Sequence, residues 1–351
     1  MDIYQQIAEL EEKIRTTPYH KGTEHQIGRW RARIAQLKEK ILESKIKKGG
    51  GGKGYAIKKS GDATVVLVGP PSVGKSSLLN KLTNSESKVG DYDFTTLSVV
   101  PGMMEYKGAK ILILDIPGII EGASLGRGRG KEVLSVARTA DLILIVVEPK
   151  SIFQITQIKK ELYEVGIRLN EEPPKVMIKK TLSGGIKISS PTLSFLNKET
   201  IKQLAEEFRI HNGEIVIKED ITLERLIDSF MGNRVYLPCI EVVNKIDLNP
   251  QINFSGLKIS VKENLGIEEL KETIWQKLEL IRIFLKPKDG PPDLNEPLIV
   301  KKGTSLKEIV QKLGFEEVKS AKIFGSGAKF PGQEVSLDFT PLSETIVSFL
   351  K

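Results

Sequence analysis

Residues 69–77 have the types and the spacing of a loop that binds a polyphosphate. The run is Gly69, Pro70, Pro71, Ser72, Val73, Gly74, Lys75, Ser76 and Ser77. In a Gly-x-x-x-x-Gly-Lys-Ser loop, successive backbone N–H groups point at the phosphates. The positively charged lysine binds the outer phosphates, and the serine hydroxyl holds Mg²⁺. Gly74 has no Cβ, so its backbone can approach the anion closely. We therefore predict a nucleoside polyphosphate site, with Lys75 as a catalytic charge and Ser76 as a magnesium ligand.

A carboxylate that follows an apolar run is the second candidate. Residues 111–114 are Ile, Leu, Ile and Leu, and they lead into Asp115, Ile116, Pro117 and Gly118. We expect Asp115 to lie beside the phosphate loop and to hold magnesium through a water molecule. The Gly118 N–H would then reach the γ-phosphate and act in catalysis.

A polar connection upstream holds the third candidate, in Phe94, Thr95 and Thr96. A threonine here can complete the magnesium shell while its backbone contacts the terminal phosphate. The residue types alone are equally compatible with two ordinary residues at the start of a strand.

The run Asn244, Lys245, Ile246 and Asp247 indicates which base is bound. The Asp247 carboxylate can accept hydrogen bonds from N1–H and the exocyclic amino group of guanine, and adenine has neither donor at those positions. A carboxylate left without these donors penalises the wrong base. Asn244 can bond the purine edge or tie the neighbouring loops together, and the Lys245 stem can cover the base.

These candidates require strands and helices that bring them together. The apolar run 65–68 predicts a strand before the phosphate loop, and Leu78, Leu79 and Leu82 give the helix after it an apolar side. Further apolar runs predict strands over 97–100, 111–114, 142–147 and 235–243, a final strand with its base-contacting loop over 257–262, and a helix over 267–280. This alternation predicts an α/β domain with a mostly parallel, doubly wound sheet.

Extra chain separates the two halves of this nucleotide-binding domain. The stretch between Asp115 and Asn244 is longer than two successive βαβ units need. We therefore predict domain parts over 61–166 and 229–285, separated by an α+β subdomain over 167–228 whose role the sequence does not reveal. After a Pro- and Gly-rich boundary, residues 286–351 predict a compact β-rich module.

Positive charge is concentrated at the N-terminus. The chain has a formal net charge of +8, and residues 1–60 hold 14 Lys and Arg against 7 Asp and Glu. Apolar residues at helical spacing predict a basic helical hairpin within 1–48, followed by a glycine-rich linker over 49–60. The charge indicates a polyanion such as RNA, or a solvated basic helix face. No apolar run is long enough to cross a bilayer, so we expect a cytosolic protein with neither a membrane nor a DNA partner.

Together, the phosphate loop, Phe-Thr-Thr, Asp-Ile-Pro-Gly, Gly-Arg-Gly-Arg-Gly and Asn-Lys-Ile-Asp motifs resemble the developmentally regulated GTP-binding proteins, within the Obg-like translation-factor GTPases. The resemblance covers nearly the whole chain. It implies a P-loop GTPase domain with a C-terminal TGS-type β-grasp module. It also implies that Thr96 is a catalytic residue and a magnesium ligand, and that Ser260 and Val261 lie in a base-contacting loop. The ligands would be GTP or GDP with Mg²⁺, and the partners a ribosome or ribosomal RNA and a stabilising protein.

Position 119 lacks the catalytic group that Ras-like GTPases have there. Ras-like GTPases have a glutamine directly after Asp-x-x-Gly to orient the attacking water, whereas this chain has Ile119. We therefore expect slow intrinsic hydrolysis of GTP to GDP and phosphate. The missing group would come from elsewhere in the chain, a monovalent cation such as K⁺, or a partner. Ser72 stands where some related GTPases hold potassium with an asparagine. Arg127 and Arg129 can act as arginine fingers, or as solvated or RNA-binding arginines.

Two functional classes remain open at this stage. The first is a GTP-driven switch in translation or another ribosome-associated process. The second is an RNA-binding scaffold in which the bound nucleotide is mainly structural.

Overall fold

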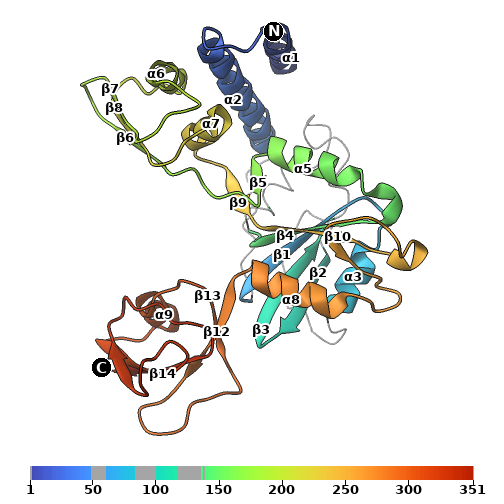
Figure 1. Cartoon of the computed structure of the whole chain (residues 1–351), viewed down its shortest axis with the longest axis vertical. Helices are drawn as coiled ribbons and strands as arrows, with labels where there is room; N and C mark the ends of the chain where they lie inside the picture. Colours follow the sequence, from blue (N-terminus) through green and yellow to red (C-terminus); the bar gives the residue numbers. More distant parts are fainter. Residues whose placement is uncertain (1, 49–60, 84–99, 117–135, 137–138, 351) are drawn as a thin grey trace. The chain divides into compact units, whose positions relative to one another are not determined.

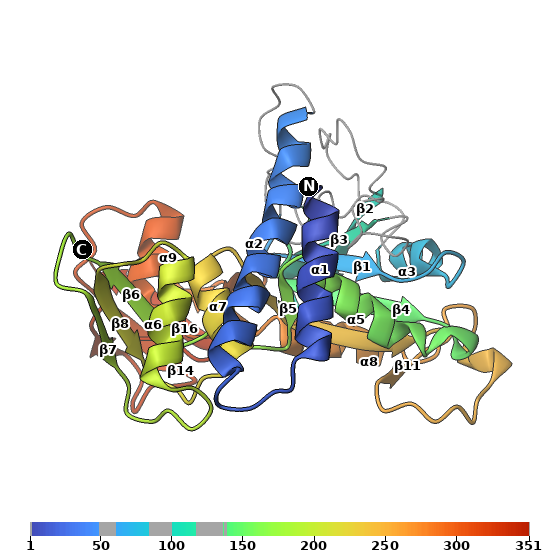
Figure 2. The same ribbon diagram turned by 90° about the horizontal axis from the view of Figure 1, so that it is seen from above.

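A computed structural model of the chain describes residues 2–48, 61–83, 100–116, 136 and 139–350, with only the backbone described for 42–48 (Figures 1 and 2). The described residues form two compact units. One contains the N-terminal helices and residues 166–236, and the other contains the central sheet and the C-terminal module. Phe94, Thr95, Thr96, Pro117, Gly118, Ile119, Arg127, Arg129 and the predicted linker lie outside the described residues.

A six-stranded sheet with the order β11-β10-β4-β1-β3-β2 forms the centre of the second unit. Its strands are β1 (Ala63–Val68), β2 (Val100–Tyr106), β3 (Ala109–Asp115), β4 (Leu142–Val147), β10 (Cys239–Val243) and β11 (Leu257–Lys258). All neighbours pair in parallel except β2, which is antiparallel to β3. The predicted mostly parallel sheet is confirmed. Of the strand expected at 97–100, residues 97–99 lie outside the described residues, and Val100 begins β2.

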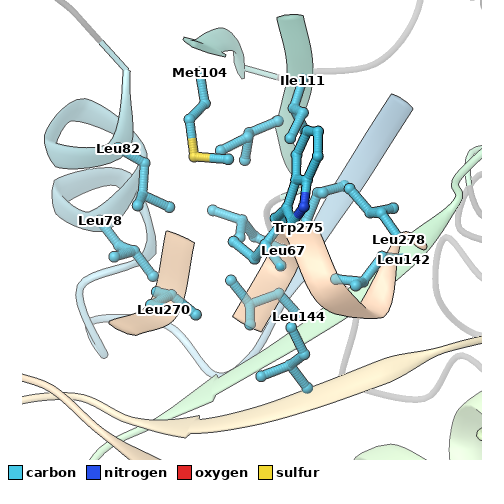
Figure 3. Packing of buried hydrophobic residues seen from close by; sticks show 14 of the residues in the cluster. Leu67, Leu78, Leu82, Met104, Ile111, Leu142, Leu144, Leu270, Trp275 and Leu278 are labelled. Carbon is cyan, nitrogen blue, oxygen red and sulfur yellow. The ribbon is translucent and has the colours of Figure 1, made fainter. Parts of the chain in front are cut away.

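Apolar residues cover both faces of this sheet, which is why β1 is a continuous run of buried side chains. On one face, α3 (Lys75–Leu82) and α8 (Ile267–Lys277) pack their apolar sides against β1, β3 and β4. Figure 3 shows Leu78 and Leu82 from α3 and Leu270 and Trp275 from α8 around Leu67 of β1. On the other side lies α5 (Gln154–Glu164), next to β4 (Figure 1).

The turn between β2 and β3 is fixed to α8 by polar contacts. The Tyr106 hydroxyl donates to Glu272 Oε2 at 2.8 Å, and Lys107 Nζ lies 2.7 Å from the same oxygen. These hydrogen bonds, that of Lys107 first, lower the pKa of Glu272 to about 2. The contacts hold the hairpin that directly precedes Asp115.

The inserted segment packs with the N-terminal helices, which the sequence did not predict. A three-stranded sheet, β6 (Val176–Lys180), β8 (Gly213–Ile217) and β7 (Ile186–Ser189), is covered on one face by α6 (Lys198–Glu207) and α7 (Leu223–Met231). Helix α1 (Ile3–Thr16) packs on α2 (Glu24–Lys48). Ala32 of α2 is fully buried in the cluster formed by α6 and α7, and Arg31 pairs with Glu224.

The predicted end of the insert at 228 is wrong, because it falls inside α7. Thr222 caps the start of this helix through its side chain, and Gly232 ends it in a left-handed conformation. The chain leaves the insert through β9 (Val235–Leu237), which pairs with β5 (Ile167–Leu169). Pro238 separates β9 from β10, so the single strand predicted over 235–243 is two strands.

The C-terminal module begins earlier than predicted. Its sheet has the order β13-β12-β16-β14-β15, and its first strand is β12 (Leu280–Leu285). The boundary at 286 is therefore wrong. Ile281 and Ile283 are buried in the core of the module rather than in the core around β1. The other elements are β13 (Leu298–Lys301), α9 (Leu306–Leu313), β14 (Ser320–Gly325), β15 (Gln333–Val335) and β16 (Thr345–Leu350). The assignment to a TGS-type β-grasp stays a prediction.

Within the described ranges, no helix is both long and apolar enough to cross a bilayer.

Candidate nucleotide-binding site

The loop between β1 and α3 has the backbone that close approach to an anion requires. Gly74 has a φ of +92°, and a Cβ on it would lie 2.6 Å from Asn244 Nδ2. A Cβ on Gly69 would lie 2.0 Å from the carbonyl oxygen of Val146. Both positions therefore require glycine. Helix α3 begins at Lys75, so its free N–H groups and the positive end of its dipole face this loop.

Lys75 is buried, and its ammonium group bonds to the loop itself. Nζ donates to the carbonyl oxygens of Gly69 at 2.9 Å and Pro70 at 2.8 Å. Burial lowers the pKa of Lys75, and the Asp115 carboxylate opposes this shift. An anionic ligand such as a phosphate would therefore stabilise the charged form of Lys75.

Ser76 and Asp115 supply the oxygen atoms that a magnesium ion prefers. The Ser76 hydroxyl donates to Asp115 Oδ2 at 2.7 Å. The other carboxylate oxygen, Oδ1, is buried and has no hydrogen-bond partner among the described residues. Buried carboxylate oxygens normally have a partner, so this oxygen is suited to contact a bound cation. The two residues line a cavity of about 300 Å³ whose other lining residues are Ser72, Gly74, Lys75 and Ser77. A hydroxyl beside a carboxylate fits Mg²⁺.

Asn244 ties the phosphate loop to the loop after β11. Its Nδ2 donates to the Val73 carbonyl at 2.9 Å, and its Oδ1 accepts from the Val261 N–H at 3.1 Å. Of the two roles that the sequence allowed, these contacts favour holding the loops together over bonding a purine edge.

Lys245 and Asp247 lie on the same connection, which follows β10. Lys245 Nζ donates to the Ser72 carbonyl at 2.7 Å and to Glu148 Oε2 at 2.8 Å. Asp247 is half-buried, and its Oδ1 accepts from the hydroxyl of the fully buried Ser260 at 2.6 Å. The structure thus brings the Asn-Lys-x-Asp motif, Ser260 and Val261 to the end of the sheet that carries the phosphate loop.

The structure also locates the candidates Ile116 and Pro71. Ile116 is buried, and Pro71 is exposed in the phosphate loop.

Glu148 is a residue of this site that the sequence did not predict. It follows β4 directly, but an isolated glutamate after an apolar run has no motif that would have drawn attention to it.

Replacing Glu148 by glutamine should weaken GTP binding modestly. The change removes the charge that holds the Lys245 ammonium beside Ser72. Both side chains are partly exposed, so we expect about a three- to tenfold loss of affinity, in line with about 1 kcal/mol for such a pair. Titration with a fluorescent GTP analogue measures this. Glu241→Gln is the matched control, because it breaks the partly exposed Lys159–Glu241 pair elsewhere on the sheet and should leave affinity unchanged.

Comparison with known proteins agrees with this geometry. A family described as "50S ribosome-binding GTPase" matches residues 64–180, and one described as "C-terminal region of MMR_HSR1 domain" matches residues 183–280. A GTP-binding protein of Methanocaldococcus jannaschii is 49% identical over 96% of this chain and 90% of its own length. Developmentally-regulated G-protein 3 of Arabidopsis thaliana is 41% identical over 99% of each chain. Developmentally-regulated GTP-binding protein 1 of Xenopus laevis is 41% identical over 98% of each chain.

Proposed function

Because the chain belongs to the developmentally regulated GTP-binding proteins, we propose that it is a GTP-driven switch that acts on ribosomes or ribosomal RNA. The chain is a GTP-binding protein with a GTPase domain. One observation supports the switch most directly. Asn244 joins the guanine-reading connection to the phosphate loop through Val73. A single ligand can therefore contact both the loop that grips phosphates and the carboxylate that selects guanine.

The residues of the site divide the chemistry between them. The loop N–H groups and Lys75 bind the phosphates, and Lys75 also opposes the charge that develops during in-line attack by water. Ser76 and Asp115, together with Thr96, would hold Mg²⁺, which when bound neutralises charge on the β- and γ-phosphates. Asp247, oriented by Ser260, selects guanine, and the Lys245 stem covers the base.

The residue directly after Asp-x-x-Gly has no group that could orient the attacking water. Ile119 stands where Ras-like enzymes have a glutamine. We therefore propose slow intrinsic turnover that a partner accelerates, and we propose that the stretches around Thr96 and Gly118 order on the γ-phosphate and relax after hydrolysis. A monovalent cation is the second proposed source of help, and turnover in KCl compared with NaCl tests it.

Single-turnover hydrolysis of GTP, with and without ribosomes, tests the switch. We expect ribosomes to accelerate wild type and Lys75→Ala to lose at least 100-fold in rate, because the lost charge acts in the transition state. Co-sedimentation with ribosomes should differ between GDP and a non-hydrolysable GTP analogue.

The scaffold alternative makes the opposite prediction. In that case the amount of protein that sediments with ribosomes would be the same with either nucleotide and for Lys75→Ala. Equal affinity for GTP and ATP would contradict guanine recognition itself.

A further inference from the structure

We infer that one face of the inserted three-stranded sheet binds base-paired RNA. This face deepens the proposed function, because it names a part of the chain that would contact RNA. The inference rests on that function only for the choice of RNA as the polyanion.

The face is defined by the alternation of side chains along β6, β7 and β8. Ile178, Ile188 and Ile215 point inward and pack with α6 and α7. Their neighbours in each strand point to the opposite side. We call this side the outer face, and it consists of Lys175, Met177, Lys179, Lys187, Ser189, Glu214, Val216 and Lys218.

The outer face has ordered rows. Met177 and Ser189 flank Val216 across the three strands, and Lys179 and Lys187 flank Glu214. Beyond the row of Met177, Val216 and Ser189, the Lys218 N–H donates to the Lys175 carbonyl at 2.9 Å, which places those two lysines side by side. The result is a middle row without charge that has lysines on both sides of it (Figure 1 shows the three strands).

The outer face carries four lysines and one carboxylate, that of Glu214. Lys175, Lys179, Lys187 and Lys218 are all exposed. By the usual spacing of strands, the Cα atoms of Lys179 and Lys187 are about 10 Å apart across the sheet, and those of Lys175 and Lys179 about 13 Å apart along β6. One carboxylate, that of Glu214, cannot neutralise all four lysines. Lys175 does lie 3.9 Å from Glu172, but both side chains are mostly exposed, and such a pair is weak. The face therefore retains positive charge that a polyanion can use.

The cations of the face can bind the phosphates of a polyanion. All four are lysines, and a lysine ammonium binds a phosphate as a point charge. None of the eight outer-face residues is aromatic, so unpaired bases would find no surface on which to stack.

Duplex RNA is a polyanion whose bases are paired, and its shape fits the outer face. Its minor groove is wide and shallow, and it presents 2′-hydroxyl groups between two phosphate strands. The outer face can approach such a groove, with Ser189 and the 56% exposed Met177 over the sugars and the lysines over the phosphates. Duplex DNA has a narrower minor groove and no 2′-hydroxyl groups.

Binding of the full chain to a 20-base-pair RNA duplex, followed by fluorescence anisotropy across a KCl series, tests this inference. The variant Lys179→Gln/Lys187→Gln should bind about 60-fold more weakly in 0.1 M KCl and should lower the slope of log K against log [KCl] by about 1.8, as expected for two lost phosphate contacts. Glu214→Gln should bind more tightly, because it removes the carboxylate that repels phosphate. Both variants should bind GTP as wild type does.

The matched control is Lys198→Gln/Lys202→Gln on α6, which removes the same charge from exposed positions of the same subdomain. An equal loss in this control, or unchanged binding in the outer-face variant, would overturn the inference. Competition by a poly-glutamate peptide that exceeds competition by the RNA would assign the face to an acidic protein, and equal binding of a DNA duplex would overturn RNA selectivity. Loss of nucleotide-dependent sedimentation with ribosomes would refute the switch alone and leave this result standing.

Discussion

Replacing Asp247 by asparagine is expected to exchange GTP for xanthosine triphosphate as the preferred ligand. Ser260 donates to Oδ1 of Asp247 and would hold an asparagine in the same way, so the amide NH₂ would take the place of Oδ2. That NH₂ group would face the amino group at C2 of guanine, which is also a donor. In xanthine it would face the carbonyl oxygen at C2, which accepts a hydrogen bond. We expect GTP affinity to fall at least 100-fold, about 3 kcal/mol, because a buried donor would be left without an acceptor.

Titration with fluorescent GTP, XTP and ATP analogues measures the exchange. Ser260→Ala is the companion variant: it keeps the carboxylate and removes only the hydroxyl that orients it, so it should lose about tenfold in GTP affinity without gaining XTP. If Asp247→Asn bound GTP as wild type does, the carboxylate would not read the base, and the assignment of guanine to this site would fail.

Replacing Asp228 by asparagine is expected to destabilise the unit formed by the insert and the N-terminal helices by about 3–5 kcal/mol. Asp228 is buried and accepts from Arg168 Nη2 at 2.7 Å and from Arg168 Nε at 2.6 Å. Arg234 Nε donates to the same carboxylate at 3.0 Å. Asparagine has nearly the same shape but no charge, so the Arg168 guanidinium would lose the carboxylate that it contacts in a low-dielectric environment. Arg234 would keep Glu39 at 3.8 Å.

Urea unfolding followed by circular dichroism measures this loss in the full chain. Glu206→Gln on the exposed side of α6 removes one negative charge from the same unit and should change stability by no more than about 0.5 kcal/mol. If Asp228→Asn lowered the free energy of unfolding by less than about 1 kcal/mol, the Asp228 charge would not be needed to stabilise the two arginines, and the prediction would be wrong.

The parts of the fold that the sequence predicted are those in which local pattern and final environment agree. The run Ala63–Val68 is apolar throughout because both of its faces are buried, so the strand was visible without any knowledge of its neighbours. Helix α7 was not recognised as a boundary element. Its apolar side packs on α2, which lies nearly 200 positions earlier in the chain, and no local pattern records such a contact.

The candidate site shows the same division. Lys75, Ser76 and Asp247 belong to motifs whose spacing reflects the shape of one ligand, so spacing alone identified them. The contact between Asn244 and Val73 joins residues 171 positions apart, and the ion pair between Lys245 and Glu148 joins residues 97 positions apart. Such contacts depend on strand order, which places β4 between β1 and β10.

Strand β12 makes the two halves of the second unit difficult to separate. Leu280 at its start and Ile299 on its partner β13 are buried in the core around β1, while Ile281 and Ile283 are buried in the C-terminal sheet. A protein shortened to end at 285 would keep β12 but lose both strands that pair with it, leaving an unpaired apolar edge of the kind that aggregates. Ending the chain at 278 removes that strand but still uncovers the surface on which Leu280 and Ile299 rest. A nucleotide-binding fragment that stays monodisperse would therefore need polar replacements on that surface as well as a shorter C-terminus.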